Sequence, residues 1–159
     1  MHVASFADIK KIAFIPKEKE ADIKKLAEAF WPGPMTLILP KKPCIPDTVS
    51  GGLETVAVRI PNHPLTLELL RLSGVPIAGP SANISGNPSS TRFSHVFEDF
   101  DGKIAGIIKA STKSYGLESS VIDMSSETPI LLRPGSLSIE DIQKILPHIS
   151  TKAKNSSEE

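Results

Sequence analysis

The chain is short of cysteine, of aromatic residues and of net charge. Its 159 residues include one cysteine, Cys44, and 5% aromatic residues, while 18 Lys and Arg balance 18 Asp and Glu. A lone thiol cannot form a disulfide within the chain, which favours a reducing, cytoplasmic location. Zero net charge argues against a broad basic face for nucleic acid. No apolar run approaches the roughly 18 residues of a membrane span, so no membrane association is expected.

Several familiar catalytic signatures are missing as well. The sequence holds no phosphate-binding loop of the GxxxxGK type, no GxGxxG, no HExxH and no GxSxG. Its four histidines are scattered, without neighbours at metal-binding spacing. We therefore predict no protein-bound metal site. Any chemistry must depend on small polar residues and on the four arginines.

The 14 prolines and 10 glycines separate short apolar segments. Apolar residues at helical spacing predict helices over 6–13, 17–29, 64–72, 91–100 and 139–146. Short apolar runs predict strands over 35–39, 55–60, 75–78, 104–109, 120–124 and 130–133. This alternation favours an α/β fold with a twisted open sheet and helices on its faces. We expect one domain over 1–149, a long loop over 41–53 and a polar tail or linker over 150–159.

Two arginines occupy matching positions at the ends of predicted strands. Arg59 and Arg133 each close an apolar run and are followed by a proline within two residues. Because ligands of α/β sheets bind at strand ends, and because guanidinium groups suit phosphate and carboxylate, we interpret both as ligand-binding residues. The competing interpretation for either one alone is a solvated ion pair at a sheet edge. Arg71 and Arg92 fall on predicted helices and suit the surface.

Two hydroxyl-rich loops adjoin predicted strands: one follows a strand, and the other leads into one. Residues 79–91 are dense in Ser, Asn, Gly and Pro, and can present backbone N–H groups to an anion or merely form a capped turn. Residues 116–123 place serines at the head of a strand, next to Glu118. Glu118 suits a general base less well than an orienting or surface role, because no second carboxylate accompanies it. The turn at 31–34 is most simply a rigid connection with Trp31 in the core.

Together these segments closely resemble the YrdC-like domain of the threonylcarbamoyl-adenylate synthase family. The matching blocks lie in the same order across residues 1–147, at 2–3, 30–37, 56–61, 80–86, 116–123 and 132–135. The resemblance implies a YrdC-like α/β sheet with a concave ligand cavity. It also implies synthesis of threonylcarbamoyl-adenylate and pyrophosphate from L-threonine, bicarbonate and ATP, for the threonylcarbamoyladenosine modification of tRNA.

The resemblance also implies roles for individual residues. Around ATP it places Thr55, Ser81, Asn83, Ser89 and Arg133, with Ser81 and Asn83 at the reacting phosphates. Around L-threonine it places His2, Arg59, Gly79 and Ser119. Mg²⁺ is implied as a cofactor that the ATP phosphates themselves hold for the most part. We expect the two arginines to line one cavity onto which Ser81 and Ser119 open.

The chain departs from the family pattern at its start. Residues 1–4 read as the middle of a strand, and an upstream segment with a Lys-x-Arg motif is expected to be missing. We therefore expect an N-terminally truncated domain with reduced synthase activity. The alternative function is a double-stranded RNA or tRNA-binding module without catalysis. Other tRNA threonylcarbamoylation factors are possible partners under either interpretation.

Overall fold

The computed structural model describes residues 1–110 and 118–151, which fall into two compact units. The first unit combines Met1–Ala78 with the chain from Glu118 onward, and the second is Gly79–Leu117. Gly116 and Leu117 of the predicted serine loop, and residues 152–159 of the predicted tail, lie outside the described residues.

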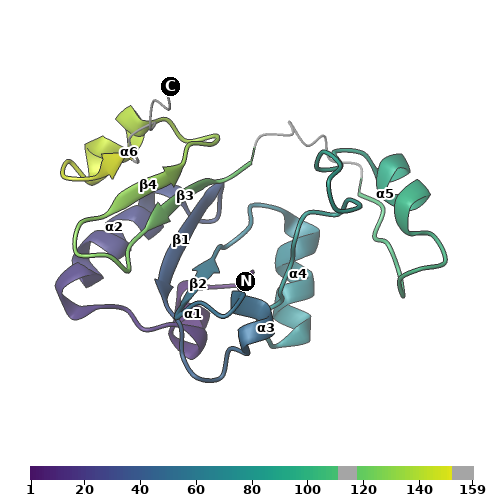
Figure 1. Ribbon diagram of the computed structural model, residues 1–159, viewed down its shortest axis with the longest axis horizontal. Helices are drawn as coiled ribbons and strands as arrows, with labels where there is room; N and C mark the ends of the chain where they lie inside the picture. The colour runs from purple at the N-terminus through teal and green to yellow at the C-terminus, as the bar shows by residue number, and fades with distance from the viewer. Residues whose placement is uncertain (111–117, 152–159) are drawn as a thin grey trace, which may run out of the picture. The chain divides into compact units, whose positions relative to one another are not determined.

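The first unit contains a sheet of five described strands in the order β2-β1-β3-β4-β5 (Figure 1). The pairs β1–β2 and β3–β4 are antiparallel, and β1–β3 and β4–β5 are parallel. The strands are β1 (Met35–Pro40), β2 (Thr55–Val58), β3 (Ser120–Asp123), β4 (Ile130–Arg133) and β5 (Ser150–Thr151). The helices of this unit are α1 (Phe6–Ile12), α2 (Glu20–Phe30), α3 (Asp47–Ser50), α4 (Pro64–Ser73) and α6 (Ile139–Ile145).

One face of the sheet packs on helices to form the core. In β1 the side chains alternate, so that Met35, Leu37 and Leu39 are fully buried. They meet apolar side chains from the inner faces of α1, α2 and α6, such as Ile23 and Ile142. Figure 1 shows α2 running behind the strands, with α6 at one end of the sheet. The predicted α/β fold is confirmed.

Two of the predicted helices begin with a serine cap. The Ser5 hydroxyl accepts a hydrogen bond from the N–H of Asp8 at the start of α1. The Ser138 hydroxyl accepts one from the N–H of Asp141 at the start of α6. These bonds satisfy backbone donors that a helix leaves without an internal partner.

The first residues of the chain extend the sheet beside β2. The N–H of Val3 donates to the carbonyl of Arg59 at 3.0 Å, and the N–H of Arg59 donates to the carbonyl of Met1 at 3.0 Å. On its other side His2 exchanges two backbone hydrogen bonds with Ile77, at 2.8 and 3.0 Å. The strand-like start that we predicted is therefore paired on both sides.

Three local predictions need correction. Residues 75–78 form no strand, because only Ile77 makes a bridge, to His2. Residues 104–109 form no strand either, since no described segment pairs with them, and Ile104 and Ile108 are exposed. Ser150 and Thr151, assigned to the polar tail, instead pair with β4 as β5. The predicted loop over 41–53 also contains the one-turn helix α3.

The described part of the second unit, 79–110, consists of a loop followed by α5 (Phe93–Phe100) and a segment without regular secondary structure. Its side chains make small local clusters: the rings of Phe93 and Phe97 are 5.6 Å apart, and the Lys109 ammonium lies 5.4 Å from the Phe93 ring centre. No residue of its described part, 79–110, is buried. This unit therefore has little core of its own.

Candidate functional site

The face of the sheet opposite the core carries the polar residues of the candidate site. Alternation along β1 turns Thr36 and Ile38 to this face, between core residues Met35, Leu37 and Leu39. Thr36 is therefore a hydroxyl placed on the open side of an otherwise apolar strand.

Strand register places both predicted arginines in one row with Thr36. Thr36 pairs with Val121 of β3, and Val121 pairs with Arg133 of β4. On the other side Leu37 pairs with Val58, so continuing that register by one residue brings Arg59 opposite Thr36. With strands about 4.8 Å apart, the backbones of Arg59 and Arg133 are separated by roughly 14 Å. The two guanidinium groups thus flank the same strip of sheet.

Arg59 is held by the turn that precedes β1. Its Nε donates to the carbonyl of Gly33 at 3.0 Å, and the N–H of Gly33 donates back to the carbonyl of Ile60 at 2.9 Å. Gly33 has no room for a side chain, because a Cβ there would overlap the carbonyl of Phe30. Burial lowers the pKa of Arg59, and the nearby positive charge of Arg133 lowers it further. The two arginines therefore share one electrostatic environment.

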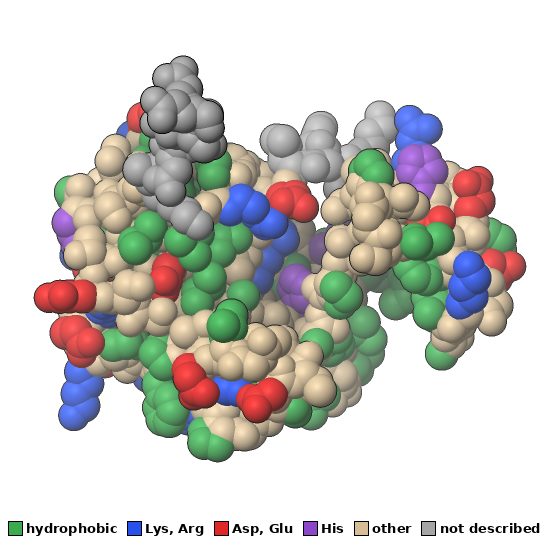
Figure 2. Space-filling model, in the orientation of Figure 1, with side chains coloured by type: hydrophobic (Ala, Val, Ile, Leu, Met, Phe, Trp, Pro, Cys, Tyr) green, Lys and Arg blue, Asp and Glu red, His purple; other side chains and the backbone are tan. Residues whose placement is uncertain are grey.

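Arg133 is fixed by the loop that leads into β3. Its Nη2 donates to the carbonyl of Ser119 at 2.9 Å and lies 3.4 Å from the Ser119 hydroxyl, while its Nε lies 3.3 Å from the same carbonyl. Its Nη1 forms an ion pair with Glu118 at 2.7 Å, and both side chains are about half exposed. Figure 2 shows basic and acidic side chains meeting on the surface of this unit. Glu118 thus forms an exposed ion pair with an arginine, in keeping with the orienting or surface role that the sequence favours.

Ser119 is the buried centre of this cluster. Its hydroxyl lies 2.8 Å from the hydroxyl of Thr36. The loop is held close to β4 because Gly135 packs directly against the backbone of residues 118–120, where a Cβ would overlap main-chain atoms. The next residue, Ser120, forms two hydrogen bonds with Leu137, at 2.9 and 3.1 Å. The glycine therefore allows the approach that brings Arg133 to Ser119.

Two further predicted residues lie near Arg59 or on its strand. His2 lies at the edge of the sheet, and Thr55 lies on the same face as Arg59. His2 lies beside Arg59 through the parallel bridge. Thr55 begins β2 and shares the face of Arg59, four residues away, which is about 13 Å along a strand. The structure thus brings His2 and Arg59 together and keeps Thr55 at the far end of β2.

The remaining predicted residues, Gly79, Ser81, Asn83 and Ser89, belong to the second unit. There the Asn83 amide donates to the carbonyls of Ile84 and Asn87, at 3.0 and 2.9 Å, and closes the loop on itself. The Asn83 side-chain oxygen is buried without a hydrogen-bond partner among the described residues. The proximity of Ser81 to the arginines stays a prediction.

Sequence reasoning missed two contributors to the site. Thr36 carries the hydroxyl that meets Ser119, and Gly33 supplies the carbonyl that holds Arg59. A polar residue at an alternate position of an apolar strand is the signal that could have found Thr36. Gly33 lies in the turn at 31–34, which we interpreted as a rigid connection. Trp31 is indeed buried there, at 9% exposure, and its indole N–H donates to the carbonyl of Met35.

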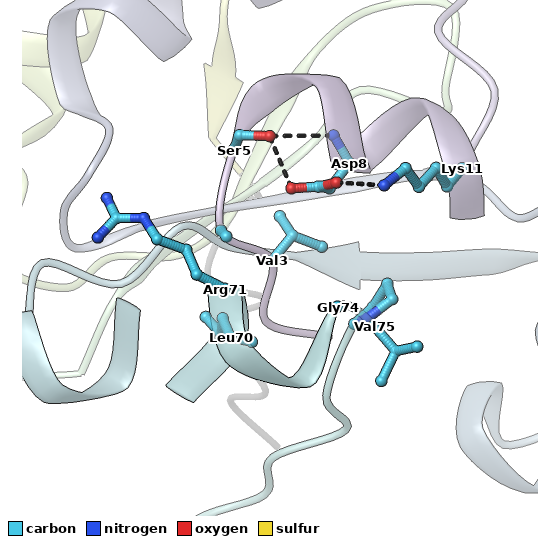
Figure 3. A pocket seen from close by; sticks show the side chains of 10 residues that line it. Val3, Ser5, Asp8, Lys11, Leu70, Arg71, Gly74 and Val75 are labelled. Atoms are coloured by element: carbon cyan, nitrogen blue, oxygen red, sulfur yellow. Dashed lines mark hydrogen bonds and ion pairs between the residues drawn. The ribbon is translucent and has the colours of Figure 1, made fainter. Parts of the chain in front are cut away.

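Two cavities of the first unit lie away from these residues. One, of about 410 Å³, lies between α1 and the end of α4 (Figure 3). Its carboxylate, Asp8, already accepts hydrogen bonds from Lys11 and Ser5, which lower its pKa. The other, of about 450 Å³, is mainly apolar and is bordered by Phe6 and Trp31. Neither is lined by a residue that the sequence predicts for the site.

Comparison with known proteins decides the family. The family model for Sua5, YciO and YrdC proteins, described as "Telomere recombination", matches residues 1–135. The chain belongs to the Sua5/YciO/YrdC family. This confirms the resemblance that the sequence motifs indicate.

Individual members of the family give the extent of the match. The chain is 50% identical over 149 residues to the threonylcarbamoyl-AMP synthase of Pyrococcus abyssi, covering 94% of this chain and 43% of the relative. It is 46% identical over 147 residues to that of Bacillus subtilis, covering 92% and 42%. The chain thus spans less than half the length of these relatives.

Solved structures agree with this assignment. The crystal structure of P. abyssi Sua5 complexed with L-threonine superposes with a TM-score of 0.87 at 49% identity, over 95% of this chain and 44% of that one. Escherichia coli YciO superposes with a TM-score of 0.73 at 18% identity, over 87% of this chain and 66% of that one, which is a likeness of fold alone. The sheet and its helices therefore have the fold of this family.

Proposed function

We propose that this chain is the YrdC-like part of an L-threonylcarbamoyladenylate synthase. The reaction joins L-threonine, bicarbonate and ATP into threonylcarbamoyl-AMP and pyrophosphate, in the cytoplasm, for threonylcarbamoyladenosine modification of tRNA. The row of Arg59, Thr36 and Arg133 beside Ser119 carries the proposal, because it offers two anion-binding groups on one open strip of sheet. The 50% identity to a named synthase supports it.

The two arginines suit different anions. Arg59 is partly buried, and among the described residues its hydrogen bond runs from Nε, so the two terminal nitrogens of its fork face no described acceptor and suit the carboxylate of L-threonine. The amine then stays free to take up carbon dioxide from bicarbonate as a carbamate. A carbamate oxygen forms the new bond to the α-phosphorus of ATP, the bond to the β-phosphate oxygen breaks, and pyrophosphate leaves with the displaced electron pair.

Arg133 and its loop suit the nucleotide. Arg133 is more exposed and can exchange the Glu118 carboxylate for phosphate, with Thr55, Ser81, Asn83 and Ser89 as further ATP-binding residues. Ser119, His2 and Gly79 complete the proposed threonine site. Preorganised donors of this kind stabilise charge that develops during phosphoryl chemistry.

Mg²⁺ enters the proposal as a companion of ATP. Within residues 1–110 and 118–151, no three His, Cys, Asp or Glu side chains converge as metal ligands. We propose that the ATP phosphates carry the ion in, since Mg²⁺ in such sites takes few protein ligands and neutralises phosphate charge. Within the same described residues, no helix has the length and apolarity to cross a membrane.

Substitution of the arginines tests the proposal. We expect Arg59→Ala to weaken L-threonine binding about 10- to 100-fold, as loss of a charged hydrogen-bonding group does. Arg133→Ala should instead raise the ATP concentration needed for half-maximal pyrophosphate release. Arg71→Ala, on the exposed side of α4, is the matched control and should change neither. Equal effects of all three substitutions would contradict the proposal.

The comparisons do not favour the alternative of an RNA-binding module, because the relatives are named as synthases. If RNA binding is the main activity, affinity for a tRNA should fall steeply between about 50 and 200 mM salt while L-threonine binding is absent. Other threonylcarbamoylation factors remain proposed partners.

A further inference from the structure

Thr36 occupies the middle of the arginine row and touches Ser119 directly. Its side chain projects from β1 onto the open face, and its hydroxyl lies 2.8 Å from that of Ser119. Arg133 approaches the same Ser119 hydroxyl from β4 at 3.4 Å. The Ser119 oxygen is thus shared between a neutral hydroxyl and a cation.

Counting protons limits how these groups can bond. A guanidinium only donates, so the Ser119 oxygen accepts from Arg133, and Ser119 has a single proton of its own to give. If Ser119 donates to Thr36, that proton is spent inside the protein. If Thr36 donates to Ser119, the Ser119 proton is free for a ligand. An arriving carboxylate, which only accepts, stabilises the second arrangement.

We propose that Thr36 is a positioning residue that turns the proton of Ser119 toward the carboxylate of L-threonine. This inference rests on the proposed function, which places L-threonine at Ser119 and Arg59. Thr36 acts through Ser119 and does not itself hold the substrate. Its position between Arg59 and Arg133 places the donated proton on the strip of sheet that these two positive groups flank.

Thr36→Val tests this with little change of shape. Valine keeps the branched side chain that suits a strand and replaces the hydroxyl with a methyl group. We expect the dissociation constant for L-threonine, measured by calorimetry, and its KM to rise about 10-fold. The kcat at saturating substrates and the KM for ATP should change less than about twofold. Thr36→Ser should restore L-threonine affinity, because serine supplies the same donor.

A double-substitution cycle separates positioning from a general packing effect. In a Ser119→Ala background, adding Thr36→Val should weaken L-threonine binding no further, because the group on which Thr36 acts is gone. Ile38→Val, on the same face of the same strand, is the control for altered packing and should leave L-threonine affinity unchanged. Fully additive losses in the cycle would overturn the inference.

The outcomes also distinguish this inference from the proposed function. If the unaltered chain binds L-threonine and the Thr36→Val variant binds it equally tightly, the role of Thr36 is overturned and the synthase proposal stands. Failure of the unaltered chain to bind L-threonine would overturn the proposed function and the role of Thr36 with it.

Discussion

Arg59 and Arg133 resemble each other in sequence but differ in how their charges are compensated. Within the part of the chain that the structure describes, Arg59 bonds a backbone carbonyl, whereas Arg133 also pairs with the Glu118 carboxylate. An anion that binds Arg133 must therefore compete with Glu118. Arg59 thus keeps a positive potential around it, whereas Arg133 has a carboxylate partner that a bound anion can replace.

Replacement of Glu118 should reveal that competition. We expect Glu118→Gln to tighten ATP binding up to about fivefold, because an exposed ion pair contributes only about 0.2–1 kcal/mol. Affinity for ATP in the two proteins, compared by calorimetry at one salt concentration, measures this. Glu127→Gln, at an exposed position before β4, is the charge-matched control. Weaker ATP binding in Glu118→Gln would show instead that Glu118 holds Arg133 in its binding position.

Asp123 makes part of the stability depend on pH. Burial acts to raise its pKa, but hydrogen bonds from Ser125 and Ser126 lower it, and the net result is a lowered pKa. A carboxyl whose folded pKa is depressed stabilises the fold above its unfolded pKa, about 3.9. That contribution is lost as the pH falls through the folded value.

The difference between the unaltered chain and Asp123→Asn isolates this effect. We expect the unaltered chain to have a higher urea midpoint of unfolding than Asp123→Asn at neutral pH. The difference between the two midpoints should narrow below about pH 4, as Asp123 takes up a proton. Other carboxyl groups titrate equally in both proteins and cancel in the comparison. A gap that stays constant down to low pH would contradict the assignment.

At the scale of elements, the contact between the end of β4 and the start of β3 builds half of the site. Gly135 lies against the backbone of residues 118–120 and leaves no space for a methyl group. We expect Gly135→Ala to destabilise the fold by about 1–3 kcal/mol, as overpacking does, and to displace Ser119. The free energy of unfolding, measured with denaturant, and the affinity for L-threonine should both decrease.

Gly106 provides the control for that substitution. A Cβ at Gly106 meets no atom of the described residues within 4 Å, and its backbone does not require glycine. Gly106→Ala should therefore leave stability within about 0.5 kcal/mol of the unaltered chain. If both alanine substitutions were equally mild, the close approach at Gly135 would not be a determinant of the site.

An element could be predicted from the sequence where the residues that stabilise it lie next to it in the chain. The helices α1 and α6 were predictable because Ser5 and Ser138 are local caps. Residues 104–109 were not, because an apolar run becomes a strand only where another segment pairs with it. The site was half predictable for a similar reason: Arg59 and Arg133 stand out by position, whereas Gly33 acts through a carbonyl that every residue has.

At the scale of the whole molecule, burial is concentrated in the first unit. Every buried residue of the described chain belongs to it, and the described part of the second unit, 79–110, exposes Ile84, Phe97, Ile104 and Ile108. Regions with few buried contacts open locally at low free energy. The stability of the chain is therefore expected to be uneven.

Hydrogen exchange measures that difference directly. Amides of β1 and β3, in the centre of the sheet, should exchange slowest, with protection close to that of global unfolding. Amides of α5 should exchange many-fold faster. Uniform protection across both units would contradict this division. Saturation with ATP should raise protection over 79–91 if the predicted serine loop binds the nucleotide.

The turn that holds Arg59 also contains the chain's single tryptophan. Trp31 lies buried two residues from Gly33, whose carbonyl accepts the hydrogen bond from Arg59. The indole is thus a built-in optical reporter. Its fluorescence should be blue-shifted in the folded chain, and a change in its intensity on titration with L-threonine would follow occupancy of Arg59 without any label.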